Sequence, residues 1–367
     1  MKIVLDAHIP YLAEAVQGEW REVRIYPMEP EEITPSAIRD ADVLVVRTRT
    51  GVDEALLKDS SVRLVCTATI GYDHIDTAYC DSRGIRWVSC PGCNAKAVCE
   101  YIEEAIDEYL NSQLSTIHTA SADRSRPCRD KNYQLSTFNY SQLSTLNSKL
   151  SILNSQFSIG IIGVGHVGSL VAQMAERKGF RVLLNDPPKG IGVSLDEIAK
   201  NCDIITFHTP LILQPSTLLL SPSERGREVF PTYHLCDEAF LRCCKPGALI
   251  INAARGGVVD EQALLRSGHP YILDTWEGEP HPDHEVLEHA LFASMHIAGY
   301  SEEGKRNASQ MCLDAIAQQF RLPPITLLPP LQKAPAAADS AWLASITAQL
   351  KAAPDHFEQL RKEYPLR

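Results

Sequence analysis

Short apolar runs alternate with segments of helical periodicity along most of the chain. In the first third these runs are Ile3–Leu5, Val43–Val46 and Leu64–Thr69. Continuous apolar runs separated by helices are typical of parallel strands whose two faces are both buried. Because ligands bind beyond the carboxyl ends of such strands, we expect polar residues there to line a binding site. The residues at these ends are Arg47, Thr48 and Thr69.

The same alternation returns between residues 159 and 298. Strand-like runs occupy 181–184, 203–207, 245–252 and 271–274. The pattern predicts an α/β protein with two doubly wound parallel sheets, each covered by helices. Further helices are predicted at Val98–Leu110, after Gly304, and in a tail at Trp342–Leu350 and Phe357–Tyr364.

A polar segment at 111–156 interrupts this alternation. It is rich in Ser, Asn, Gln, Thr and Leu, and it repeats Gln-Leu-Ser-Thr at irregular spacing. A stretch of about 45 such residues is too long for an ordinary loop and too polar for a core. We therefore expect a low-complexity insertion at 111–156 and a second long loop at 213–231.

A glycine motif, Gly163-x-Gly165-x-x-Gly168, stands between an apolar run and a helical pattern, and the next apolar run ends at Asp186. In this arrangement the first Gly permits a tight turn, the second lets the backbone approach a pyrophosphate, and the third lets helix and strand pack. The helix start offers free N–H groups to the phosphates. Asp186 can accept hydrogen bonds from the ribose hydroxyls of NAD. The motif therefore predicts NAD binding.

Composition narrows the class of protein. The 367 residues, 44% of them hydrophobic, suffice for two or three domains. No apolar run reaches the length of about 18 residues that a membrane span needs. The net charge of −11 argues against a nucleic-acid surface. The first residues lead directly into a strand-like run without a signal-peptide layout, so we expect a cytoplasmic protein.

The 11 cysteines are scattered and odd in number, which is typical of reduced thiols. Cys90-Pro-Gly-Cys93 has the spacing of a redox pair or of half a metal site. Since the chain has no second CxxC, we favour a turn that happens to carry two cysteines, and we predict no metal.

Three chemically suitable side chains follow strands of the second half: Arg255, Glu279 and His296. Alone, each has a plain structural explanation as a surface ion pair, a helix-start acid or a core histidine. Together they fit the oxidation of an alcohol beside a carboxylate. Histidine can accept the hydroxyl proton near neutral pH, a carboxylate can orient the imidazole, and an arginine can grip the substrate carboxylate through two hydrogen bonds.

These features resemble the D-isomer-specific 2-hydroxyacid dehydrogenase family. The shared motifs, besides the glycine turn and Asp186, are His208-Thr-Pro, Asn252-Ala-Ala-Arg-Gly, Asp274-x-Trp-Glu-x-Glu-Pro and His296-x-Ala-Gly. A narrower resemblance within the family implies a small phosphorylated hydroxyacid as substrate. It rests on Val46-Arg-Thr, Thr67-Ala-Thr-Ile-Gly, Pro91-Gly-Cys-Asn-Ala, Asn185-Asp-Pro-Pro and the tail from Phe357 to Tyr364.

The resemblance implies a role for individual residues. Arg255 would bind the substrate carboxylate, His296 would exchange the proton, and Glu279 would support His296. Substrate contacts would come from Thr48, Thr69 and Tyr300. The implied NAD contacts are Gly163, Gly165, His166, Val167, Gly168, Asp186, Thr209, Ala253, Ala254, Arg255, Asp274 and Gly299. Arg47 is in addition a suitable partner for a substrate phosphate, because guanidinium groups bind phosphate well.

The resemblance also implies a domain organisation. Residues 1–97 and 299–320 would form a flavodoxin-like substrate-binding domain. Residues 98–298, with the insertion at 111–156, would form a Rossmann domain that binds NAD. Residues 321–367 would be a short C-terminal dimerisation segment, which implies a homodimer.

Two alternatives stay open at this point. One is another enzyme of the family, such as a phosphoglycerate dehydrogenase, although the chain lacks the regulatory domain often attached to that activity. The other is a protein that keeps the fold and senses NAD without turnover, since a fold does not by itself establish an activity.

Overall fold

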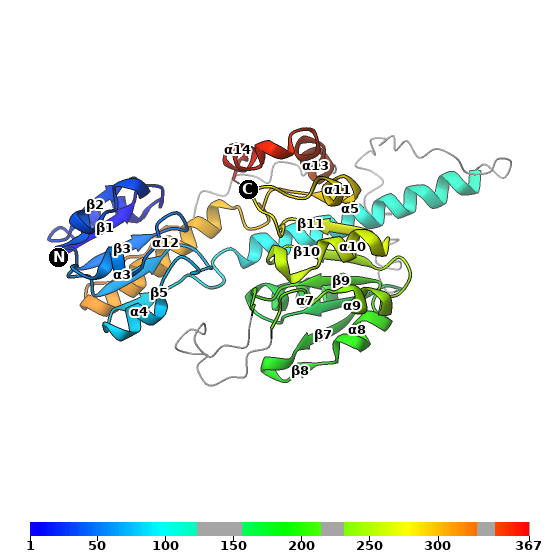
Figure 1. Ribbon diagram of the computed structural model, residues 1–367, viewed down its shortest axis with the longest axis horizontal. Helices are drawn as coiled ribbons and strands as arrows, with labels where there is room; N and C mark the ends of the chain where they lie inside the picture. Colours follow the sequence, from blue (N-terminus) through cyan, green and yellow to red (C-terminus); the bar gives the residue numbers. More distant parts are fainter. Residues whose placement is uncertain (123–155, 214–230, 329–341, 367) are drawn as a thin grey trace.

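The structure is a computed structural model that describes residues 1–122, 156–213, 231–328 and 342–366. It contains two parallel-sheet units (Figure 1). The helix α5 (Ala95–Ala122) leads from the first unit into the second, and α12 (Glu302–Phe320) returns to the first. The predicted α/β class is confirmed.

The first unit is a five-stranded parallel sheet of order β2-β1-β3-β4-β5. Its strands are β1 (Lys2–Asp6), β2 (Arg24–Met28), β3 (Val43–Val46), β4 (Leu64–Thr67) and β5 (Arg86–Val88). Its helices besides α12 are α1 (Leu12–Glu19), α2 (Pro35–Ile38), α3 (Glu54–Leu57) and α4 (Thr77–Ser82).

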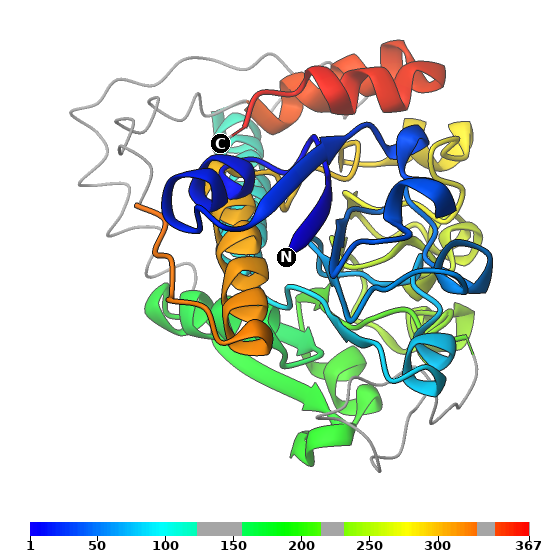
Figure 2. The ribbon, with the colours of Figure 1, turned by 90° about the vertical axis from the view of Figure 1, so that its left-hand side faces the viewer.

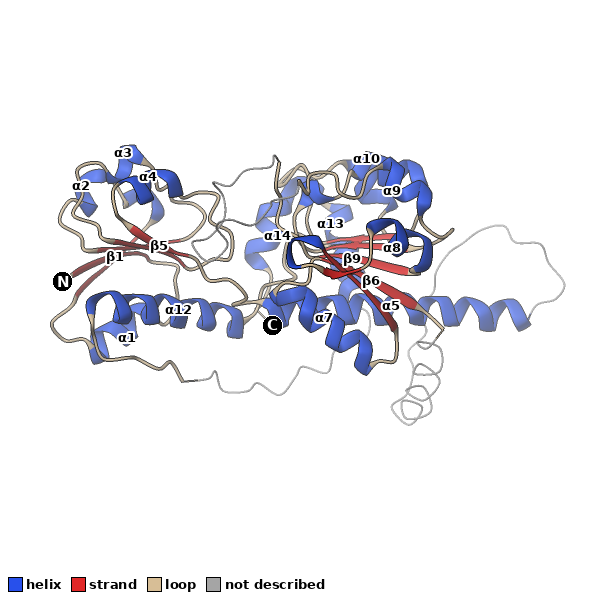
Figure 3. Cartoon of the chain, turned by 90° about the horizontal axis from the view of Figure 1, so that it is seen from below, coloured by secondary structure: helices blue, strands red, loops and turns tan. Residues whose placement is uncertain are grey.

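Successive residues of a strand face opposite sides of this sheet, so both faces carry a core. Ile3 and Leu5 pack with α1 and α12, whereas Val4 packs with α2, α3 and α4. Figure 3 shows α1 and α12 below the sheet and the other three helices above it. The apolar runs of β1, β3 and β4 are continuous because both faces of these strands are buried.

The second unit is a seven-stranded sheet of order β12-β11-β10-β9-β6-β7-β8. Its strands are β6 (Ser158–Ile162), β7 (Arg181–Asp186), β8 (Ile191–Gly192), β9 (Ile204–Phe207), β10 (Leu249–Asn252), β11 (Tyr271–Leu273) and β12 (Phe292–Ala293). Its helices besides α5 are α7 (His166–Arg177), α8 (Leu195–Asn201), α9 (Glu238–Cys243), α10 (Glu261–Ser267) and α11 (His284–His289).

One edge of this sheet differs from the parallel arrangement expected from the sequence. The two-residue strand β8 pairs antiparallel with β7. Only a single short turn, Pro187–Lys189, and Gly190 separate the two strands. Such a short connection leaves no room for the crossover helix that a parallel pair requires.

The segment expected as an insertion from residue 111 begins as regular structure. The helix α5 continues to Ala122, well past the predicted end at Leu110. The rest of that expected insertion, and residues 214–230 of the second long loop, lie outside the described residues.

The tail forms the two helices that the sequence predicts, α13 (Trp342–Ala352) and α14 (Phe357–Glu363). Leu343, Ile346 and Leu350 are buried against the second sheet, and Thr347 Oγ1 accepts a hydrogen bond from the Ala293 N–H at 2.9 Å. Both helices lie along one edge of the molecule (Figure 2, red). Among the described helices, none is long and apolar enough to serve as a bilayer span.

Candidate active site

The glycine turn lies at the carboxyl end of β6. Gly163 has a φ of 89°, in the left-handed region that favours glycine. A Cβ on Gly168 would lie 1.9 Å from the Gly163 carbonyl oxygen, so only glycine lets α7 pack this close to the turn. A Cβ on Gly165 would meet open space. The turn is therefore closely packed against the protein at Gly168 and open at Gly165, where a ligand would approach.

Polar groups around this turn are available to a dinucleotide. Gly165 caps α7 without a side-chain hydrogen bond, so the first N–H groups of α7, at His166 and Val167, face outward from the helix end. Asp186 ends β7, and its Oδ2 accepts a hydrogen bond from the Val164 N–H at 2.9 Å. Thr209 follows β9, and its buried Oγ1 has no partner among the described residues.

The predicted histidine and glutamate are in direct contact. His296 Nδ1 lies 2.8 Å from Glu279 Oε2, and the Trp276 N–H donates to Glu279 Oε1 at 2.9 Å. Because Nδ1 faces the carboxylate, this pairing leaves Nε2 free to exchange a proton with a substrate. The side chain of His296 is 36% exposed, so the imidazole is accessible while its carboxylate partner is more buried.

The protonation state of Glu279 follows from its surroundings. Burial alone would raise the pKa of this carboxyl, but the hydrogen bond and charge of His296, the Trp276 N–H and the charge of Arg361 together lower it. Glu279 therefore stays ionised at neutral pH. An ionised partner stabilises the imidazolium that forms when His296 accepts a proton.

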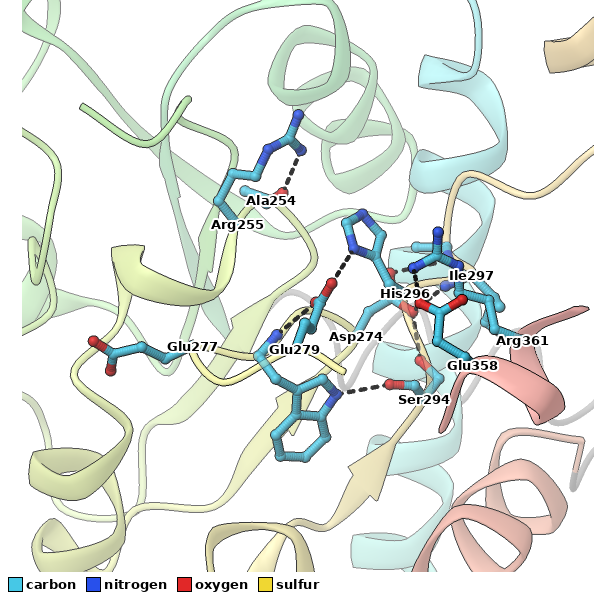
Figure 4. Close-up of polar contacts among 12 residues, drawn as sticks. Ala254, Arg255, Asp274, Glu277, Glu279, Ser294, His296, Ile297, Glu358 and Arg361 are labelled. Carbon is cyan, nitrogen blue, oxygen red and sulfur yellow. Dashed lines mark hydrogen bonds and ion pairs between the residues drawn. The ribbon is translucent and has the colours of Figure 1, made fainter. Parts of the chain in front are cut away.

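Asp274 holds the loop that carries the histidine. Its Oδ1 accepts hydrogen bonds from the Ser294 hydroxyl at 2.6 Å and the Ile297 N–H at 2.7 Å, and its Oδ2 accepts one from the Ala298 N–H at 3.0 Å. These bonds surround His296 in the sequence and are visible in Figure 4. A direct contact between Asp274 and a cofactor stays a prediction.

Arg255 follows β10 and extends to the same side as the imidazole of His296 (Figure 4). Its Nη1 donates to the Ala254 carbonyl at 2.7 Å. Its Nη2 lies 3.0 Å from the position of a Cβ on Gly71, so the guanidinium reaches the loop after β4 in the first unit. Arg255 therefore lies between the two sheet units, where a substrate would be enclosed.

The expected substrate residues of the first unit lie at the carboxyl ends of neighbouring strands. Arg47 and Thr48 follow β3, and Thr69 follows β4. The Thr69 hydroxyl donates to the Gly71 carbonyl at 2.8 Å, which ties Thr69 to the loop against Arg255. Thr48 is exposed.

Two further cations, not predicted as site residues from the sequence, lie near these residues. Lys305 lies in the first turns of α12, with its ammonium 5.7 Å from the centre of the Tyr300 ring. Arg361 comes from the tail helix α14, and its Nε donates to the Tyr300 hydroxyl at 3.4 Å. The motif Glu303-Gly-Lys305 and the basic tail helix were visible in the sequence, but no spacing rule connects them to His296.

The remaining expected contacts come from loops around the same edge. Gly299 lies so close to Asn94 that a Cβ there would be 2.0 Å from Asn94 Nδ2. Ala253 and Ala254 directly follow β10, where the Ala254 N–H donates to Asn252 Oδ1. Which of these groups touches a cofactor stays a prediction.

The Cys90–Cys93 pair is not arranged as a redox or metal site. Cys90 Sγ lies 3.8 Å from the sulfur of Cys312 in α12, and its thiol donates to the Ala308 carbonyl. Burial raises the pKa of the Cys93 thiol to about 12, so Cys93 is a poor nucleophile. Within the described residues, no three His, Cys, Asp or Glu side chains are grouped to hold a metal.

Comparisons with known proteins give a consistent result. A family model described as D-isomer specific 2-hydroxyacid dehydrogenase, catalytic domain, matches residues 3–326. Erythronate-4-phosphate dehydrogenase of Bacteroides fragilis is 38% identical over 100% of this chain and 97% of its own length. The proteins of the same name from Porphyromonas gingivalis and Pseudomonas putida are 36% and 33% identical, each over 100% of this chain and 92% of its own length.

Solved structures agree on the fold. A D-lactate dehydrogenase from Aquifex aeolicus, complexed with NAD and lactic acid, superposes with a TM-score of 0.60 at 20% identity, over 87% of this chain and 95% of its own. An NAD-bound 3-phosphoglycerate dehydrogenase from Entamoeba histolytica gives a TM-score of 0.59 at 24% identity, over 88% of this chain and 95% of its own. The family resemblance inferred from the motifs is confirmed.

Proposed function

This chain belongs to the D-isomer specific 2-hydroxyacid dehydrogenase family, and on that premise we propose that it oxidises 4-phospho-D-erythronate with NAD. The product would be 2-oxo-3-hydroxy-4-phosphobutanoate, in a reaction of vitamin B6 biosynthesis. The observation that carries the proposal is the 2.8 Å contact between His296 and Glu279, with Arg255 extending to the same side as the imidazole. The substrate is the one named by relatives that match the full chain.

The residues around the glycine turn fit NAD. The first turn of α7 would hold the pyrophosphate, and the open space at Gly165 lets it approach the backbone. Asp186 would accept hydrogen bonds from the ribose hydroxyls and repel a 2′-phosphate. The buried hydroxyl of Thr209, which has no partner among the described residues, is a further group that a cofactor would satisfy. When bound, NAD supplies the hydride acceptor.

The protein side chains would perform the rest of the reaction. Arg255 would hold the substrate carboxylate in two hydrogen bonds and thereby orient C2. Nε2 of His296 would accept the hydroxyl proton as the hydride leaves C2. The ionised Glu279 would stabilise the resulting imidazolium and keep the ring in the productive orientation. Two electrons and one proton leave C2 as hydride, and the second proton stays on His296.

The test is NADH formation, followed by its ultraviolet absorbance, with 4-phospho-D-erythronate as substrate. We expect turnover by the native chain and none by His296→Ala, whose NAD affinity should be unchanged. Turnover of 3-phosphoglycerate instead would indicate a phosphoglycerate dehydrogenase. Tight NAD binding without turnover of any phosphorylated hydroxyacid would indicate a binding protein.

The domain organisation and assembly are part of the same proposal. The segments 1–97 and 299–320 would bind substrate, 98–298 would bind NAD, and 321–367 would contribute to a homodimer in the cytoplasm. The contact of α12 with β4 and α1 supports the return of 299–320 to the first unit. Sedimentation equilibrium should report twice the chain mass. A monomer would contradict the proposed dimer but not the proposed reaction.

A further inference from the structure

A small cavity lies where the first sheet meets α12. It opens at the carboxyl ends of β1 and β3 and is lined among others by His8, Arg47, Ala68, Lys305 and Ser309. None of these residues is part of the catalytic contact between His296 and Glu279. The cavity therefore brings two cations from distant parts of the sequence, Arg47 and Lys305, into one concave surface.

In the part of the chain that the structure describes, these two cations lack anionic partners. Neither the Arg47 guanidinium nor the Lys305 ammonium forms a hydrogen bond or ion pair with another described residue. The Lys305 ammonium instead lies over the ring of Tyr300. Burial lowers the pKa of Lys305, and the nearby charge of Arg47 lowers it further. Two like charges brought together without a counter-charge are destabilising, and an anion bound between them would relieve this cost.

The other titratable groups at this place do not supply that counter-charge. His8 lies between two carboxylates, with Nδ1 3.1 Å from Asp6 Oδ1 and Nε2 3.6 Å from Glu29 Oε2. Asp6 is buried and also accepts the His8 N–H. The acids are thus held by His8, whereas Arg47 and Lys305 remain available to a ligand.

Tyr300 lies between Lys305 of the cavity and the loop that carries His296, and it contacts both. The Lys305 ammonium lies over the ring of Tyr300, and the Tyr300 N–H donates at 2.8 Å to the carbonyl of Ile297, the residue after His296. A short, extended acid with its carboxylate at Arg255 and its C2 at His296 would direct its far end along this ring.

We propose that Arg47 and Lys305 together form the subsite for the terminal phosphate of the substrate, and that this pair determines the preference for phosphorylated over unphosphorylated 2-hydroxyacids. The identity of the acid rests on the proposed function. The Arg47–Lys305 pair by itself predicts only that the ligand carries a phosphate monoester. A phosphate dianion accepts charge-assisted hydrogen bonds from both side chains and neutralises both charges.

The test compares two substrates that differ only in the phosphate. For Lys305→Gln and Arg47→Gln, we expect the KM for 4-phospho-D-erythronate to rise about 10- to 100-fold, the loss expected for one charged hydrogen bond. The kcat/KM for unphosphorylated D-erythronate should stay within about twofold of the native value. The matched control is Arg49→Gln, because Arg49 is exposed and does not line the cavity.

Inorganic phosphate serves as a second probe that does not depend on turnover. It should stabilise the native chain against heat, and this stabilisation should be lost in Lys305→Gln but kept in Arg49→Gln. Equal losses for both substrates, or phosphate stabilisation kept in Lys305→Gln, would overturn the subsite. Phosphate stabilisation lost in Lys305→Gln, in a chain that does not oxidise 4-phospho-D-erythronate, would keep the subsite and reject the proposed function.

Discussion

At the scale of single residues, the histidine that we propose as the proton acceptor has an unusual backbone conformation. His296 has a φ of 57°, in the left-handed region that costs energy for residues other than glycine. The three hydrogen bonds accepted by Asp274 hold the flanking residues and offset this cost. The imidazole is thereby aimed at Glu279 before any substrate arrives.

Replacing the partner of the histidine tests this arrangement. In Glu279→Gln the amide can still contact Nδ1, but it carries no charge to stabilise the imidazolium. We expect kcat to fall about 100-fold or more, with little change in NAD affinity. Glu277→Gln is the control, since Glu277 faces Tyr233 and His234 instead. Steady-state kinetics of both variants would check this, and equal kcat values would contradict the role of Glu279.

A second residue-scale prediction concerns pH and stability. Burial raises the pKa of Glu261 to about 8, while its Oε1 accepts the Glu277 N–H at 2.6 Å. A carboxyl whose pKa is raised in the folded state contributes stability at low pH, and that contribution is lost as the pH rises from about 4.5 to about 8. Glu261→Gln keeps an acceptor and does not ionise.

We therefore expect Glu261→Gln to be more stable than the native chain by about 1–3 kcal/mol at pH 9 and nearly equal to it at pH 4. Denaturant unfolding at several pH values measures the difference. A gap that does not change with pH would show that Glu261 is not the titrating group.

At the scale of elements, two glycines of the strand-turn-helix differ in what they allow: one permits close packing, and the other leaves space for a ligand. Gly168 meets the backbone of Gly163, whereas Gly165 meets only open space. The sequence motif assigns different roles to these two glycines, and their surroundings in the structure differ accordingly. Their alanine variants should therefore fail in different ways.

Gly168→Ala is expected to destabilise the chain by several kcal/mol, about 2–4, because a Cβ would overlap the Gly163 carbonyl. Gly165→Ala should unfold within about 1 kcal/mol of the native chain but bind NAD about 10-fold or more weakly, since the added methyl group occupies the space of the pyrophosphate. Thermal unfolding and NAD titration distinguish the two. Normal NAD affinity in Gly165→Ala would place the cofactor elsewhere.

At the scale of the whole molecule, the tail returns to the active site. The family model ends at residue 326, yet α14 beyond it places Arg361 against Tyr300. The charge of Arg361 also contributes to the low pKa of Glu279. The tail thus packs on the second sheet through α13, and through Arg361 of α14 it influences Glu279, the partner of His296.

This arrangement predicts that Arg361 is a positioning residue. Arg361→Ala should lower kcat/KM about 10-fold and shift the acidic limb of its pH profile upward, because Glu279 loses a charge that keeps it ionised. Arg361→Lys keeps the charge and should restore the pH profile. The exposed neighbour Lys362 provides the control, Lys362→Ala. An unshifted profile in Arg361→Ala would limit the residue to a structural role.

Much of this protein followed from local patterns in the sequence. The runs that became β1, β3, β4 and β6 are largely apolar because both faces of these strands are buried. The turn at Gly163 was predicted from its glycine spacing together with the flanking strand and helix patterns and the acid at Asp186. The antiparallel strand β8 and the extension of α5 to Ala122 were not predicted. The first is too short for a periodic signal, and the second has a composition that also suits a loop.

What the amino-acid order determined by itself is therefore local: strands, helices, the glycine turn and the acid at Asp186, each set by neighbours in the chain. Only the tertiary structure brought Lys305 beside Arg47 and Arg361 beside Tyr300. The physical reason is that side chains far apart in the sequence interact through space only after the two sheets and the tail have packed. The periodicity of the sequence does not show which distant side chains will be in contact, because these contacts form only when the chain folds.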